Sequence, residues 1–124
     1  KIMIQHGHGK IINIASIFGL VADKQVLPYL AAKGGMIQMT KGLALEWAKH
    51  NIQVNAVAPG YVVTPMNQKD LLDERIYKNV IGKIPMRRFG KIEDIAGIVI
   101  FLASEAADYA TGAVFNIDGG WLCQ

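Results

Sequence analysis

Three short apolar runs rich in β-branched residues, separated by helix-like stretches, constrain the fold of this chain most strongly. They cover residues 10–15, 52–57 and 113–117. The first reads Lys-Ile-Ile-Asn-Ile-Ala, a composition that suits a strand buried in a parallel sheet. Strands that alternate with helices form right-handed crossovers within one parallel sheet. The sequence therefore predicts an α/β fold with three parallel strands and crossover helices.

The stretches between these runs carry helix signals. Pro28 suits the first turn of a helix, and apolar residues then recur at a helical spacing, at Met36, Met39, Leu43 and Trp47. We expect this helix to end near Lys49. Residues 65–83 form a polar stretch that we also expect to be helical. A further helix is predicted from Glu93, and because it is apolar nearly all round we expect it to be buried.

Three strands make only half of the usual doubly wound sheet, which has about six. The strand at 10–15 would then lie at an open edge, which is a liability in an isolated domain. We therefore expect residues 1–124 to be the C-terminal catalytic portion of a single Rossmann-type domain, without its N-terminal dinucleotide-binding half.

Composition excludes several classes of partner. The net charge is only +3 and the Lys and Arg residues are scattered, which argues against nucleic-acid binding. The longest apolar run, 95–103, is far shorter than the ~20 residues that cross a bilayer. A lone Cys123 cannot form an internal disulfide, so we expect a cytoplasmic protein. His6 and His8 have no further ligand cluster, so no metal site is expected.

Three side chains could form one catalytic group. Tyr29 and Lys33 are four residues apart at the start of a helix, so they share one face. Ser16 follows the first strand, and ligands of open α/β sheets bind beyond the carboxyl ends of strands. An ammonium group beside a phenol stabilises the phenolate, which suits proton exchange with an alcohol. An isolated Tyr-x-x-x-Lys pair is more often a packed ring beside a solvated amine.

The motifs around this group give it more weight. Asn-Ile-Ala-Ser at 13–16, Tyr-Leu-Ala-Ala-Lys at 29–33, Val-Asn-Ala-Val-Ala-Pro-Gly at 54–60, Thr64 and Asp-Gly-Gly at 118–120 occur in one order. With the thirteen-residue step from Ser16 to Tyr29, they resemble the classical short-chain dehydrogenases/reductases over essentially the whole chain.

The resemblance implies a role for each matching residue. Tyr29 matches the general acid/base, Lys33 the residue that assists it and holds the nicotinamide ribose, and Ser16 the serine that orients substrate. The segment that passes the nicotinamide of NAD or NADP is matched by Pro59, Gly60, Val62 and Thr64. The family's glycine-rich phosphate loop, its NAD/NADP-selecting residue and the Asn of its catalytic tetrad have no counterpart in this sequence.

The resemblance also suggests a substrate and an assembly. The substrate would be a small-molecule secondary alcohol or ketone. The runs at 46–51 and 118–121 look most like gluconate and 2-deoxygluconate dehydrogenases, which act on sugar acids. The enzymatic alternative is a 3-oxoacyl reductase of the same family. The non-enzymatic alternative is a non-catalytic fragment that acts only through subunit association. Small residues on the 28–49 helix favour a homotetramer or dimer.

Two further features have other expected roles. Arg87 and Arg88 are expected to serve at the surface or in packing, and residues 66–86 are predicted to form a mobile lid.

Overall fold

The computed structural model describes residues 1–65, 67–71 and 73–124, and its centre is one parallel sheet. The strands are β1 (Gly9–Ile14), β2 (Ile52–Pro59) and β3 (Val114–Ile117), in the order β1-β2-β3. Each lies within two residues of its predicted position. The predicted α/β arrangement with three parallel strands is confirmed.

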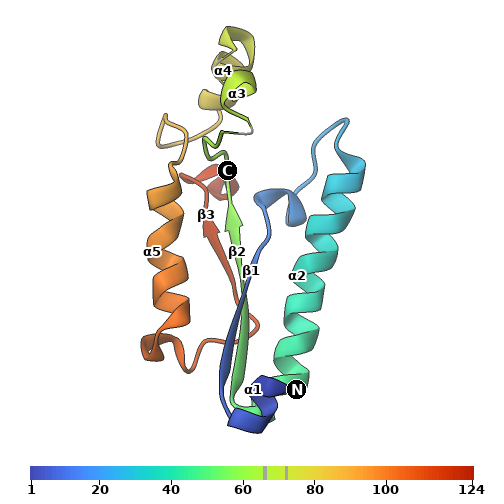
Figure 1. Ribbon diagram of the computed structural model, residues 1–124. Helices are drawn as coiled ribbons and strands as arrows, with labels where there is room; N and C mark the ends of the chain where they lie inside the picture. The colour runs from blue at the N-terminus through green and yellow to red at the C-terminus, as the bar shows by residue number, and fades with distance from the viewer. Residues whose placement is uncertain (66, 72) are drawn as a thin grey trace.

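Two long helices cover the sheet, one on each face (Figure 1). They are α2 (Leu27–Trp47) and α5 (Ile92–Ala103). Neighbouring residues of β2 point to opposite faces, so Ala56 packs with Ile37 of α2, and Val57 packs with Leu102 of α5. The first seven residues of β2 are all buried, because the strand has a neighbour on each edge and a helix on each face.

Shorter elements complete the described chain. They are α1 (Ile2–His6), η1 (Ile17–Gly19), η2 (Ala48–His50), α3 (Gln68–Leu71), α4 (Glu74–Ile81), η3 (Glu105–Ala107) and η4 (Trp121–Cys123). The polar stretch expected to be helical contains α3 and α4, which lie beyond the carboxyl end of β2 (Figure 1). The proposed lid at 66–86 stays a prediction, and its residues Met66 and Leu72 lie outside the described part.

The edge of the sheet formed by β1 is open. In the described part of the chain, β1 pairs with β2 alone, in parallel from Gly9 opposite Ile52 to Ile14 opposite Val57. Ile14, at the end of β1, is 46% exposed. The expectation that the first strand lies at an uncovered edge is confirmed.

The expectation that the helix after Glu93 is buried all round is wrong. Leu102 is buried and Ile95, Ile98 and Val99 pack partly against the sheet, but Ile92, Ile100 and Phe101 are exposed. Only one face of α5 packs against the sheet, and these three side chains lie outside that contact. Residues such as Met39 and Leu45 are exposed on the outer face of α2 in the same way.

None of the helices in the described residues combines the length and the apolar character that crossing a membrane requires.

Candidate active site

Ser16 lies where the chain leaves β1. Its backbone is still extended, and its Oγ accepts a hydrogen bond from the backbone N–H of Phe18 at 3.2 Å, which caps η1. The residue is 6% exposed. The capping bond fixes the Ser16 side chain at the carboxyl end of the sheet, as the sequence predicts.

Tyr29 and Lys33 lie in the first two turns of α2, beside that end of the sheet. Lys33 Nζ donates to the backbone oxygen of Ile14 at 2.8 Å and lies 5.6 Å from the centre of the Tyr29 ring. The Tyr29 ring is 45% exposed and meets Phe18 edge to face, with the ring centres 6.5 Å apart. Lys33 therefore joins the helix to the end of the strand that carries Ser16, with its charge beside the tyrosine ring.

The segment after β2 forms the opposite side of the same region. Gly60 approaches the C-terminal loop closely, because a Cβ atom there would lie 2.8 Å from Asp118 Cα. The side chain of Asn67 then fixes the next residues: its Oδ1 accepts from Thr64 N at 2.8 Å, and its Nδ2 donates to Val62 O at 2.9 Å. Val62 also forms a parallel bridge with Gly90.

These elements enclose one cleft of about 750 Å³. It is lined by all seven residues that the sequence singled out: Ser16, Tyr29, Lys33, Pro59, Gly60, Val62 and Thr64. Reasoning from sequence missed five further lining residues, which are Ile14, Ala15, Pro65, Ile92 and Ile95. They have no reactive group, and their only sequence signal is their place at a strand end or near the start of a helix.

The cleft suits the nicotinamide end of a dinucleotide. The apolar side chains of Val62, Ile92 and Ile95 can lie against a flat ring. Thr64 and Lys33 supply polar groups on opposite sides of the same space. The arrangement can hold an oxygen-bearing substrate next to such a ring, with three hydroxyls and one ammonium group lining the cleft.

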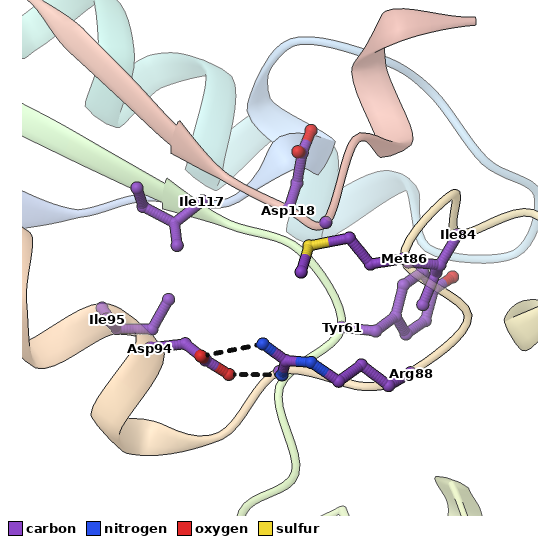
Figure 2. A pocket seen from close by; sticks show the side chains of 10 residues that line it. Tyr61, Ile84, Met86, Arg88, Asp94, Ile95, Ile117 and Asp118 are labelled. Carbon is purple, nitrogen blue, oxygen red and sulfur yellow. Dashed lines mark hydrogen bonds and ion pairs between the residues drawn. The ribbon is translucent and has the colours of Figure 1, made fainter.

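A smaller cavity of about 190 Å³ lies next to the cleft, and the two share Ile95 (Figure 2). At its side Arg88 forms a two-pronged ion pair with Asp94, at 2.6 and 3.0 Å. Asp94 also accepts a 2.8 Å hydrogen bond from the backbone N–H of Lys91. Arg88 and this N–H together lower the pKa of Asp94 to about 2. The pair fixes the start of α5, in keeping with the packing role expected for Arg88.

This ion pair predicts how stability depends on pH. Because the pKa of Asp94 is lower in the folded than in the unfolded protein (about 3.9), its carboxylate stabilises the fold above that pH and loses this effect as pH falls to about 2. We expect Asp94→Asn to lower the free energy of unfolding slightly at pH 7, since the pair is partly exposed to solvent. Urea unfolding at several pH values should show that the difference in unfolding free energy between wild type and Asp94→Asn shrinks between about pH 5 and pH 2. A difference that grows on acidification would contradict the assignment.

His6 and His8 lie just before β1. Their ring centres are 6.3 Å apart at the amino end of the sheet, and among the residues described no three His, Cys, Asp or Glu side chains gather into a possible metal site.

The sequence is similar to characterised oxidoreductases. It is 44% identical over 122 residues to 2-dehydro-3-deoxy-D-gluconate 5-dehydrogenase of Bacillus subtilis, covering 98% of this chain and 48% of that protein. It is 45% identical over 118 residues to a 3-oxoacyl-[acyl-carrier-protein] reductase of Thermotoga maritima, covering 95% of this chain and 47% of that protein. The chain thus spans about half the length of these relatives.

The fold matches a solved relative equally well. A gluconate 5-dehydrogenase from Burkholderia cenocepacia, solved with NADP and tartrate, superposes with a TM-score of 0.95 at 38% identity, covering 98% of this chain and 48% of that one. The family model described as enoyl-(acyl carrier protein) reductase matches residues 1–122. With the cleft geometry and these relatives, the chain belongs to the short-chain dehydrogenase/reductase family.

Proposed function

We propose that the protein containing this sequence is an NAD(P)-dependent oxidoreductase that interconverts a secondary alcohol and a ketone. The observation that carries the proposal is the convergence of Ser16, Tyr29 and Lys33 on one cleft, opposite Val62 and Thr64. These five side chains come from three separate parts of the chain. If Tyr29 and Lys33 had only a structural role, a serine and a space the size of a nicotinamide ring would not be expected beside them.

Each residue has a defined task in this proposal. The bound nicotinamide supplies or accepts the hydride. In reduction, Ser16 donates a hydrogen bond to the substrate oxygen and stabilises the negative charge that develops there. The Tyr29 hydroxyl gives its proton to that oxygen, and in oxidation the phenolate takes the proton back. Lys33 places its positive charge beside the Tyr29 ring, and its hydrogen bond to Ile14 O keeps the ammonium group in place.

We propose a sugar acid or a related polyol as the substrate. The Bacillus subtilis and Burkholderia cenocepacia relatives both bear sugar-acid dehydrogenase names, and their similarity covers nearly the whole chain. The Thermotoga maritima relative favours the second candidate, reduction of a 3-oxoacyl thioester. NADP in the Burkholderia structure supports NAD or NADP as the cofactor.

We also propose that the enzyme is a cytoplasmic homo-oligomer. Exposed apolar side chains on the outer faces of α2 and α5, among them Leu45 at 84% and Ile100 at 69% exposure, support subunit contacts there. The alternative, a fragment that only associates with other chains, uses the same surfaces and gives no turnover.

An absorbance assay of the enzyme that contains this sequence tests the proposal. We expect oxidation of D-gluconate or 2-dehydro-3-deoxy-D-gluconate with NAD or NADP, followed at the nicotinamide band. Reduction of a 3-oxoacyl thioester by NADPH is run in parallel. Turnover of the thioester alone would select the second candidate. Absence of turnover in all reactions, with a folded protein, would support the non-catalytic alternative.

A further inference from the structure

Packing, rather than chain connectivity, sets the distance between Ser16 and Tyr29. The two residues lie on different elements, and residues 20–25 between them are exposed and belong to no helix or strand. A connection of this kind does not by itself fix the end of β1 relative to α2. The short helix η1, which directly follows Ser16, is the element that contacts α2 there.

Gly19, the last residue of η1, lies directly on the backbone of α2. A Cβ atom at Gly19 would lie 2.7 Å from Lys33 O, 2.9 Å from Lys33 C and 2.6 Å from Ile37 Cδ1. Ile37 is 2% exposed, and the Lys33 carbonyl belongs to the helix backbone, so neither can move aside easily. Any side chain at Gly19 therefore has to push η1 away from α2, at the turn that carries Lys33.

Phe18 makes the second connection within η1. Its backbone N–H donates to Ser16 Oγ, and its ring meets Tyr29 edge to face at 6.5 Å. The Phe18 ring also meets the Tyr61 ring edge to face, with the ring centres 5.9 Å apart and an interplanar angle of 85°. One residue thus contacts the proposed substrate-orienting serine through its backbone and the proposed acid/base through its ring.

We infer that Gly19 and Phe18 are positioning residues, which hold Ser16 and Tyr29 at the separation that one substrate oxygen requires. This inference rests on the proposed roles of Ser16 and Tyr29. Neither positioning residue touches the reacting atoms. A displacement of about 1 Å between groups that act on one atom lowers rates on the order of 10²-fold. The cofactor-facing segment from Pro59 to Thr64 meets η1 through the ring of Tyr61, which packs on Phe18, but it takes no part in the close contact of Gly19 with α2.

The test is Gly19→Ala in the complete enzyme, assayed with whichever of the three substrates above reacts fastest. We expect kcat to fall about 10²-fold, while the KM for NAD or NADP changes less than about threefold. The matched control is Gly34→Ala. A Cβ atom at Gly34 would lie 3.7 Å from Gly19 O, an ordinary contact across the same interface. The control should therefore keep the wild-type kcat.

Two further variants keep the test decisive. Adding Ile37→Val to Gly19→Ala removes the Cδ1 atom nearest the new methyl group, and should restore part of the lost kcat. If Gly19→Ala does not fold, Phe18→Leu replaces it, because it keeps the N–H to Ser16 and removes the ring contact. We expect Phe18→Leu to lower kcat about 10-fold, a larger factor than its effect on cofactor KM, which it can reach only through Tyr61.

A folded Gly19→Ala enzyme with a kcat equal to that of Gly34→Ala would overturn the inference. So would an unchanged kcat in Phe18→Leu when Gly19→Ala does not fold. Failure of the proposed function has a different signature, since Tyr29→Phe would then remain active. Loss of activity in Tyr29→Phe together with normal activity in both η1 variants would leave the function standing and reject the positioning role.

Discussion

Tyr29→Phe is expected to lower the kcat of the enzyme by a factor of about 10²–10⁴ or more, with the fold unchanged. The substitution removes one hydroxyl from a ring that is 45% exposed, so little packing is lost. The hydroxyl is the group that we propose exchanges a proton with the substrate. Lys33 Nζ lies 5.6 Å from the ring centre and is held by Ile14 O, so it stays beside the ring rather than at the position of the lost hydroxyl.

Steady-state kinetics with matched circular-dichroism spectra measure this effect. Tyr109→Phe is the control, since Tyr109 is fully exposed and far from the cleft-lining residues in the sequence. It should retain full activity. Lys33→Ala should be impaired in a similar way to Tyr29→Phe. A Tyr29→Phe enzyme that keeps more than roughly a tenth of the wild-type kcat would exclude tyrosine as the acid/base.

The second large effect concerns the 124-residue chain expressed alone. We expect it to bind NAD and NADP only at millimolar concentration or above, which corresponds to about −4 kcal/mol. The cleft contacts the nicotinamide end through Lys33, Val62 and Thr64. A dinucleotide's pyrophosphate is normally held at a helix N-terminus after a glycine-rich loop, and this sequence contains no such loop.

Isothermal titration calorimetry of the purified chain measures this affinity. The complete enzyme, titrated in the same buffer, provides the comparison and should bind more tightly by about 10²-fold or more, since pyrophosphate contacts add several hydrogen bonds. Micromolar binding by the chain alone, or any dehydrogenase activity, would show that residues 1–124 already contain a complete dinucleotide site.

The sequence predicted the strands, and the meeting of Ser16, Tyr29 and Lys33 at one cleft, for physical reasons. A strand buried on both faces needs a continuous apolar run, so β2 was visible directly at 52–57. Residues four apart on a helix lie on the same face, so the spacing of Tyr29 and Lys33 predicted that their side chains are neighbours. The place of Ser16 depended on the strand before it, and the functional meaning of all three depended on the resemblance to the family.

Other features depended on tertiary packing and could not be predicted. The apolar residues of α5 indicated burial all round, yet which of them is covered depends on the elements that reach that helix. Ile92 and Ile95 line the cleft because the start of α5, where Arg88 pairs with Asp94, lies beside it. In the sequence, nothing distinguishes Gly19 from other loop glycines. Its close approach to Lys33 O follows from the packing of η1 on α2.

The order of the strands also has a consequence for the exchange of amide hydrogens with solvent. β2 has a hydrogen-bonded neighbour on each side and seven consecutive buried residues, so its amides can exchange only when the whole sheet opens. In β1, alternate N–H groups point away from β2, toward the open edge. Those amides exchange rapidly in the chain alone, and slow exchange at alternate β1 residues would report directly that another strand has paired there.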